Sequence, residues 1–342
     1  MQKTENIFPA KEAAYYFDAA FSYLEELVSK ENAVLITDEN VFRCHPAAFE
    51  GWRTIVIKPG EPFKQPATID TIIRKLVELE ADRKTFIIGV GGGVVTDITG
   101  YVACIYMRGV EFGFVPSSIL AMVDAAIGGK NGVDIGIYKN LVGLIRQPSF
   151  ILYDHSLLDS LPQEEWVNGF AEIIKHACIK DAALFDLLES ASTAEFKDSP
   201  GKLKELIKRN VEIKKGIVIQ DEFETGERKL LNFGHTFGHA IENLYHLPHG
   251  HAVSIGMVMA ADLSVEVNGL KPSSKERIVQ LLRKYSLPVT LEFNKEKVME
   301  VLKMDKKRER SEINFILLDA IGKAVIRPIP IKRLEEFITK RI

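Results

Sequence analysis

A glycine-rich turn joins two apolar runs in the stretch Thr85-Phe86-Ile87-Ile88-Gly89-Val90-Gly91-Gly92-Gly93-Val94-Val95-Thr96-Asp97. The run up to Val90 is β-branched and aromatic and predicts a buried strand, and the apolar run Val94–Met107 predicts a helix. Glycines let the main chain approach a phosphate closely, and the first turn of a helix offers free N–H groups and a positive dipole end. The pattern GxGxxG is not met, because Val94 occupies the third glycine position. Two interpretations stay open, a site for a dinucleotide pyrophosphate and a tight turn without a ligand.

Strands and helices also alternate on both sides of this turn. Short apolar runs predict strands at Ala33–Thr37, Thr54–Lys58 and Glu111–Val115, and helical spacing predicts a helix at Thr68–Leu79. This alternation is typical of a largely parallel sheet that is covered by helices. Asp38 follows the first strand, where it could accept hydrogen bonds from a ribose or serve as a turn or cap residue.

The pattern changes near residue 150. Beyond it, most segments are long and helix-spaced, and strand patterns return only close to the C-terminal end. The predicted helices are Gln163–Ile179, Leu184–Ser190, Leu203–Val218, Thr236–Tyr245, Ala252–Val267 and Ser274–Tyr285, and the predicted strands are Ile313–Leu318 and Lys323–Ile326. We therefore predict an α/β domain in residues 1–150 and a mostly α-helical domain in residues 151–342.

Composition narrows the class of function. The chain has 342 residues, 46% of them hydrophobic, and a formal net charge of −3. A nearly neutral chain has no general attraction for nucleic acid or anionic membranes, so an anion site would need a local cluster of cations. The three cysteines are widely spaced, the first eight residues do not resemble a signal peptide, and no apolar run reaches the roughly 18 residues of a membrane span. We expect a cytoplasmic protein without nucleic-acid or membrane partners.

Histidines cluster in the second half. Five of the eight lie within seventeen positions, from His235 to His251. His235 and His239 are spaced i, i+4 and would share one helix face, whereas His249 begins the next segment. Imidazoles with one carboxylate suit a divalent ion such as zinc or cobalt. Glu172 could supply the carboxylate, or it could form an i, i+3 surface ion pair with Lys175.

Several cations lie near glycines or in segments of unusual composition. The most suggestive is Lys130, which follows Gly128-Gly129, because main chain and ammonium together can hold an anion. The whole set fits a substrate with two anionic groups. It comprises Arg108, Lys130, Lys139, Lys175, Lys214 and Arg228.

Several motifs together resemble those of the 3-dehydroquinate synthase family. They are GGGVVTD, YMRG, VPSSILAMVDAAIGGK, YKN, GFAEIIK, LLNFGHTFGHAIE and HGHAVSIGM, in the family's order and with similar spacing. The resemblance runs from about Asp38 to the string Asp305-Lys306-Lys307. It implies a Rossmann-like, parallel-sheet NAD-binding domain followed by a mostly helical metal-binding domain.

The resemblance also implies roles for individual residues. The metal ligands would be Glu172, His235 and His249. The NAD pocket would be lined by Asp38, Asn40, Pro59, Gly60, Glu61, Pro62, Phe63, Lys64, Gly93, Val94, Val95, Thr96, Asp97, Ser117, Ser118, Lys130, Lys139, Leu157, Leu158, Asp159 and Ser160. Substrate contacts and catalysis would fall to Asp124, Lys130, Asn140, Lys175, Lys214, Arg228, Asn232, His239 and one of Lys306 and Lys307, with Arg108 reaching the phosphate site of the other subunit in a homodimer.

The implied activity is conversion of 3-deoxy-D-arabino-heptulosonate 7-phosphate to 3-dehydroquinate and phosphate in the shikimate pathway. It would use catalytic NAD and one divalent ion, zinc or cobalt. Another sugar phosphate cyclase and a metal-dependent polyol dehydrogenase are the alternatives. The sequence departs from the family pattern at His251, which stands where glutamate is usual, at Thr96, where glycine is common, and in Gly132–Lys139, which lacks an Asn-His-Pro string.

Overall fold

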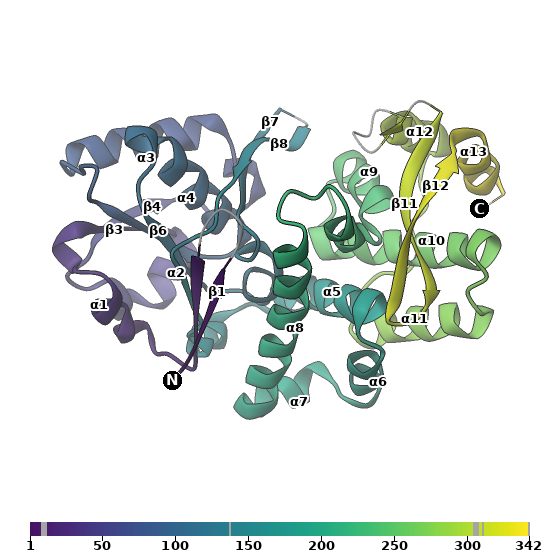
Figure 1. Cartoon of the computed structure of the whole chain (residues 1–342), viewed down its shortest axis with the longest axis horizontal. Coiled ribbons are helices and arrows are strands. Elements are labelled where there is room, and N and C mark those ends of the chain that lie inside the picture. Colours follow the sequence, from purple (N-terminus) through teal and green to yellow (C-terminus); the bar gives the residue numbers. More distant parts are fainter. Residues whose placement is uncertain (8–11, 137, 304–307, 310, 341–342) are drawn as a thin grey trace. The chain divides into compact units, whose positions relative to one another are not determined.

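The computed structural model describes residues 1–7, 12–136, 138–303, 308–309 and 311–340 (Figure 1). The chain forms two compact units, of which the first comprises Met1–Trp166 with Leu203–Phe223 and the second Val167–Lys202 with Glu224–Ile342. The division into separately folding domains at residues 1–150 and 151–342 stays a prediction.

A seven-stranded sheet organises the first unit. Its strand order is β1-β2-β9-β6-β5-β3-β4; β1 and β2 are antiparallel, and every other neighbouring pair is parallel. The strands are β1 (Gln2–Ile7), β2 (Glu12–Phe17), β3 (Ala33–Asp38), β4 (Arg53–Ile57), β5 (Phe86–Gly91), β6 (Phe112–Pro116) and β9 (Phe150–Leu152). The predicted parallel sheet is confirmed, and β3 to β6 lie within two residues of the predicted strands.

Burial explains why these strands are continuous apolar runs. All of β6 and nearly all of β3 and β5 are buried, because helices cover a parallel sheet on both faces. The helices and helical turns of this unit are η1 (Phe21–Tyr23), α1 (Leu24–Leu27), η2 (Lys30–Asn32), α2 (Glu39–Cys44), η3 (Pro46–Phe49), η4 (Glu61–Phe63), α3 (Pro66–Glu78), α4 (Gly93–Ile105), η5 (Tyr106–Arg108), η6 (Ala121–Ala125) and η7 (His155–Ser160). The carboxyl ends of the six parallel strands meet at one edge of the sheet.

A separate hairpin follows η6. Its strands are β7 (Lys130–Ile135) and β8 (Tyr138–Ile145), and β7 packs against α4. The side chain of Asn131 lies so close to Gly100 of α4 that a Cβ at Gly100 would be 1.8 Å from its Oδ1. The sequence patterns did not predict this hairpin.

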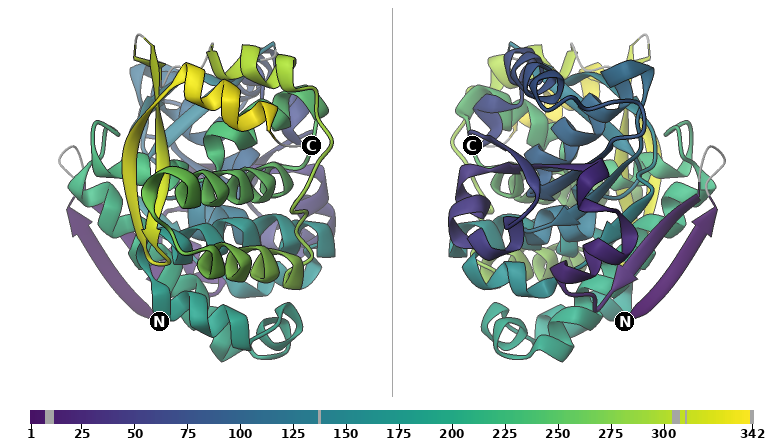
Figure 2. Two further views of the ribbon diagram at one scale, coloured as in Figure 1. Left: turned by 90° about the vertical axis from the view of Figure 1, so that its right-hand side faces the viewer. Right: turned by 90° about the vertical axis from the view of Figure 1, so that its left-hand side faces the viewer.

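Helices dominate the second unit. Its elements are α6 (Ala182–Ser190), α7 (Thr193–Asp198), η8 (Glu227–Asn232), α9 (His235–Tyr245), α10 (His249–Asn268), α11 (Pro272–Lys284), α12 (Lys295–Lys303), β10 (Arg308–Glu309), β11 (Glu312–Ala320), β12 (Lys323–Pro330) and α13 (Ile331–Thr339). The helices α5 (Gln163–Lys180) and α8 (Pro200–Gln220) each contribute residues to both units. In the left view of Figure 2, α10 and α11 run side by side, and the strands of the β11–β12 hairpin cross them.

The central helix α10 is the one described helix that is long and apolar enough to cross a membrane, by length and composition only. Within the fold, 67% of the apolar stretch of α10 is buried. Phe237 of α9 and Phe315 of β11 pack nearby, with ring centroids 5.1 Å apart, and belong to the same apolar core as Leu263 of α10. We interpret α10 as a core helix.

Candidate functional site

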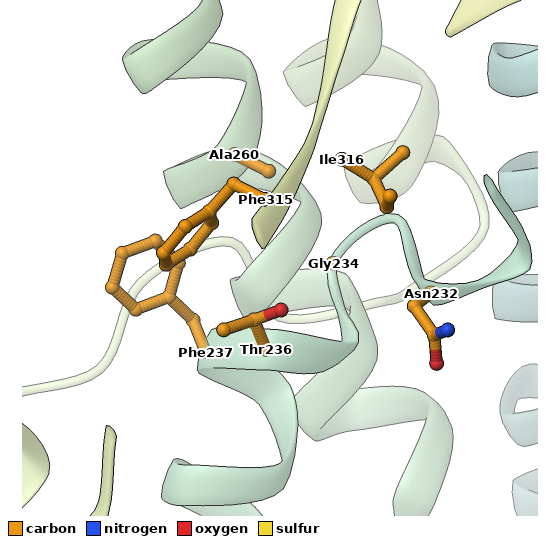
Figure 3. A pocket seen from close by; sticks show the side chains of 7 residues that line it. All are labelled: Asn232, Gly234, Thr236, Phe237, Ala260, Phe315 and Ile316. Atoms are coloured by element: carbon orange, nitrogen blue, oxygen red, sulfur yellow. The ribbon is translucent and has the colours of Figure 1, made fainter. Parts of the chain in front are cut away.

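A turn at Gly234 fixes the start of α9 in the second unit. Gly234 has a left-handed φ of 80°, and a Cβ there would lie 2.9 Å from the carbonyl oxygen of Val253. A Cβ at Gly256 of α10 would lie 1.9 Å from the carbonyl oxygen of Gly234. Gly234 and Gly256 therefore allow the start of α9 to contact α10 closely. Figure 3 shows Gly234 in the turn between Asn232 and the start of α9.

Three helices direct ligand-type side chains to one point. Glu172 of α5 is fully buried, and its Oε1 lies 3.5 Å from Nε2 of His235 and 3.3 Å from Nε2 of His249. One ligand atom from each residue lies within 4.8 Å of the other two. Two imidazole nitrogens and one carboxylate oxygen form a donor set that suits zinc or cobalt and leaves positions for substrate. These three residues are the ligands that the family resemblance implied.

The opposite ring nitrogens face acceptors. Nδ1 of His235 lies 3.2 Å from the carbonyl oxygen of Phe233, and Nδ1 of His249 lies 3.3 Å from Oε2 of Glu242. An imidazole that donates from Nδ1 presents the lone pair of Nε2. Both rings are therefore oriented with Nε2 towards Glu172.

The two carboxylates also change the protonation of His249. Burial lowers its pKa, but hydrogen bonds to Glu172 and Glu242 outweigh burial and raise the pKa to about 10. Without an ion, the ring holds a proton between two acceptors. A divalent cation would take the place of the proton on Nε2, as metal binding to imidazole requires.

Lys175 and His239 lie beside the cluster. Lys175 pairs with Glu172, but both side chains are almost completely buried, so the pair is not the surface ion pair that spacing alone allowed. His239 packs edge-on against His235, with ring centroids 5.1 Å apart. Among the described residues, the ligand group at this point contains His235 and His249 but not His239.

The other predicted substrate residues of the second unit lie on or near η8. Arg228 is 1% exposed, and the amide of Asn232 donates to Oε1 of Glu224 over 2.5 Å. His251 is half-buried in the first turn of α10. Lys306 and Lys307 lie outside the described residues.

The predicted nucleotide residues of the first unit follow the carboxyl ends of the parallel strands. Chain order reverses between β3 and β5, since β4 lies on one side of β3 whereas β5, β6 and β9 follow on the other. Such a switch point is where open α/β sheets bind ligands. After β3 comes Asp38, after β4 Pro59–Lys64, after β5 Gly93–Asp97, after β6 Ser117 and Ser118, and after β9 the segment Leu157–Ser160.

Asp38 serves as the N-cap of α2, which was one of its two predicted roles. Its Oδ1 accepts hydrogen bonds from the main-chain nitrogens of Asn40, at 2.8 Å, and Val41, at 3.0 Å. Burial raises the pKa of the Asp38 carboxyl despite these bonds. The glycine turn leads directly into α4, so its local form is the predicted strand-to-helix turn.

Lys64 joins three segments of the first unit. Its Nζ donates to Oδ2 of Asp97 and to Oδ1 of Asn140, each over 2.5 Å. Burial lowers the pKa of Lys64, but the charges of Asp97 and Glu61 outweigh this and raise it. The ammonium therefore stays charged and ties α4 to the β7–β8 hairpin.

The remaining predicted residues of the first unit occupy varied positions. Lys214 of α8 lies 2.7 Å from Oδ1 of Asp124 and donates to its carbonyl oxygen over 2.6 Å. Lys139 of β8 lies 3.8 Å from Oε1 of Glu61. Lys130 is exposed at the start of β7, and Arg108 is exposed at the end of η5 with a left-handed φ of 67°.

Two residues that contact His249 or its neighbour Gly250 were not among the predicted site residues. Glu242 stands seven positions after His235, two turns along the same helix face, and this spacing could have indicated it. Asn168 accepts a hydrogen bond from the main-chain nitrogen of Gly250 and so anchors the start of α10 to α5. Nothing in the local sequence distinguishes Asn168 from a surface residue.

Family models match most of the chain. The model described as 3-dehydroquinate synthase N-terminal matches residues 54–168, and the one described as 3-dehydroquinate synthase C-terminal matches residues 169–308. Together the two segments leave residues 1–53 and 309–342 outside the match.

Solved structures of similar fold include two cyclases and a dehydrogenase. A 2-epi-5-epi-valiolone synthase from Streptomyces hygroscopicus subsp. jinggangensis 5008, with NAD+ and Zn2+ bound, is 27% identical with a TM-score of 0.87, over 98% of this chain and 97% of that one. A 2-deoxy-scyllo-inosose synthase complexed with carbaglucose-6-phosphate, NAD+ and Co2+ is 22% identical with a TM-score of 0.84, over 100% of both chains. Glycerol dehydrogenase from Schizosaccharomyces pombe shares the fold at 15% identity and a TM-score of 0.62, over 99% of this chain and 91% of that one. The chain belongs to the 3-dehydroquinate synthase family and is an enzyme of the sugar phosphate cyclase type.

Proposed function

We propose that this enzyme is a 3-dehydroquinate synthase, which converts 3-deoxy-D-arabino-heptulosonate 7-phosphate to 3-dehydroquinate and phosphate in the shikimate pathway. The observation that carries the proposal is the convergence of two Nε2 atoms on one buried carboxylate, Glu172, in a chain of this family. The family resemblance adds that Lys214, Asn232 and His239 have the form found in dehydroquinate synthases.

The proposed cofactors are one divalent ion, zinc or cobalt, and NAD. Glu172, His235 and His249 would hold the ion. Bound there, the ion supplies Lewis acidity that lowers the pKa of a neighbouring substrate hydroxyl, and NAD supplies a hydride acceptor that is regenerated in the cycle. The nucleotide would lie along the carboxyl ends of β3, β5 and β6, with its pyrophosphate at the start of α4.

The chain's own residues bind and position the substrate. In the second unit, Lys175 and Arg228 offer buried cations for its anionic groups, and Asn232 and His239 would orient it or relay protons. In the first unit, Lys130, Asn140 and Lys214 would do the same, with Asp124 holding the Lys214 ammonium in place. Preformed charges and hydrogen bonds lower the barrier mainly by holding the reacting groups in position.

The test is turnover with NAD far below the substrate concentration. Purified enzyme should release phosphate and form dehydroquinate in amounts well above the NAD present, because hydride removed early returns later. Accumulation of one NADH per substrate consumed would contradict the proposal and favour a dehydrogenase.

Another sugar phosphate cyclase activity is the second candidate, because the similar solved structures include a valiolone synthase and a 2-deoxy-scyllo-inosose synthase. Parallel assays with sedoheptulose 7-phosphate and glucose 6-phosphate separate the three activities. A polyol dehydrogenase is disfavoured by the buried lysine and arginine, since a neutral polyol requires no such cations.

We further propose a cytoplasmic homodimer. The β7–β8 hairpin exposes four large apolar side chains, Ile135, Tyr138, Leu141 and Val142, of which Leu141 is 61% exposed. Exposed apolar patches of this kind are typical of protein–protein contact surfaces. The molar mass in solution tests this, and a monomer at micromolar concentration would contradict it.

A further inference from the structure

We propose that Glu242 is the positioning residue of the metal centre, holding His249 in the ring orientation and tautomer that binds the ion. This inference rests on the proposed metal site. It assigns a role to a carboxylate outside the ligand set, on a helix that already supplies His235.

The geometry places the His249 ring between two carboxylates from different helices. Oε2 of Glu242, on α9, lies 3.3 Å from Nδ1, and Oε1 of Glu172, on α5, lies 3.3 Å from Nε2. A carboxylate that accepts from Nδ1–H leaves Nε2 with its lone pair and raises its basicity. The ring cannot turn over without losing the bond to Glu242.

His235 provides an internal comparison. Its Nδ1 faces the main-chain carbonyl of Phe233 at 3.2 Å, a neutral acceptor that the turn before α9 holds in place. His249 stands at the first position of α10, directly after the N-cap Pro248, and its Nδ1 faces the side chain of Glu242 instead of a main-chain carbonyl. The side chain of Glu242 supplies from a neighbouring helix what the main chain supplies to His235.

The burial of Glu242 indicates that this residue does more than form part of a helix. It is 5% exposed, and its sequence neighbour Ile241 belongs to the apolar core of this unit. A buried carboxylate costs free energy unless a hydrogen-bonded or charged group compensates it. The Nδ1 atom of His249, 3.3 Å from Oε2, is such a group for Glu242.

The test is the metal affinity of Glu242→Gln, measured by competition with a chelator for Zn2+ and for Co2+. The glutamine side chain keeps the shape of glutamate and one acceptor oxygen but carries no charge. The metal affinity should therefore fall about 10- to 100-fold, the usual cost of losing a carboxylate that holds a metal-binding histidine. The visible absorption of bound Co2+ should also change, which a purely structural role of Glu242 would not cause.

Glu266→Gln is the matched control. Glu266 lies on α10, as His249 does, but pairs with Arg333 over 2.5 Å at the surface. Its substitution should leave both the metal affinity and the Co2+ spectrum unchanged. An equal loss in both variants would overturn the inference, because it would mean that any lost acid weakens binding.

The remaining outcomes separate this inference from the metal site itself. Wild-type affinity in Glu242→Gln would overturn the inference and leave the metal site intact, whereas a wild-type protein that binds neither ion would overturn both. Imidazole 15N spectra of the zinc-loaded wild type need no variant. They should show His249 protonated at Nδ1 and bound through Nε2, and the opposite tautomer would overturn the inference even if the variants did not fold.

Discussion

The nucleotide edge of the first unit and the metal cluster of the second are built in different ways. At the edge, successive loops follow successive parallel strands, and the side chain of Lys64 ties the segment after β4 to α4. In the cluster, Glu172 and His249 are 77 positions apart, and charged side chains from different helices meet in a buried place. The order of the parallel strands therefore places the segments of the edge, whereas each charge of the cluster depends on the others.

Substitution of Glu172 should have the largest effect, because this residue is both a proposed metal ligand and the buried partner of Lys175. Glu172→Gln removes a metal ligand, so the loss of affinity should exceed the about 100-fold upper range for an outer partner. It also takes from Lys175 the buried carboxylate that it faces, which should cost about 3–5 kcal/mol of stability. Metal content and denaturant unfolding measure the two effects, and full metal retention would remove the basis for the proposed site.

A double variant separates the two effects. Glu172→Gln with Lys175→Met replaces the buried pair by neutral groups, so most of the stability should return while metal binding stays lost. If the double variant were as unstable as the single one, the ion pair would not be the source of the instability.

Gly256→Ala should break the helix contact that places His235 next to His249. A Cβ would lie 1.9 Å from the carbonyl oxygen of Gly234, so α9 and α10 would have to separate, at a cost of about 3 kcal/mol. Thermal unfolding and metal affinity should both report the change.

Gly216→Ala is the control for that variant. Gly216 lies within α8, and a Cβ there would have no heavy atom within 4 Å beyond its local chain neighbours. Alanine should therefore raise stability by up to about 1 kcal/mol through its helix propensity. If Gly256→Ala behaved in the same way, close helix contact would not be what builds the cluster.

Asp38→Asn should have the smallest effect and tests the nucleotide edge. Asparagine caps a helix as well as aspartate, so α2 should persist. The half-buried Asp38 carboxyl has a pKa above its ordinary 3.8, so its ionised form costs stability at neutral pH. The variant should be slightly more stable there, and this advantage should disappear as the pH falls through the raised pKa to below 3.8.

The same variant should bind NAD more weakly, because the asparagine Oδ1 caps α2 and its Nδ2 cannot accept a hydrogen bond from a ribose hydroxyl. Unfolding against pH and NAD titration measure the two effects. If the variant were less stable at every pH and bound NAD normally, Asp38 would serve only as the N-cap of α2 and would not contact a ribose.

The parallel core was predictable from local patterns, because its strands are continuous apolar runs and its helices repeat their apolar positions every three to four residues. The sequence also determined that a histidine cluster exists after residue 235. Which histidines converge on Glu172 depends on long-range packing, since His249 and Glu242 meet only through the way in which α5, α9 and α10 pack. Spacing alone had grouped His235 with His239.

Some strands and segments also became defined only through tertiary contacts. The three residues of β9 form a strand because they pair with β2 and β6, and no local pattern that short is specific. Leu203–Phe223 belongs to the first unit although, in the sequence, it falls between two segments of the second unit. No periodicity in the sequence could indicate this. Local patterns report which face of an element is apolar, and long-range packing decides which partner covers it.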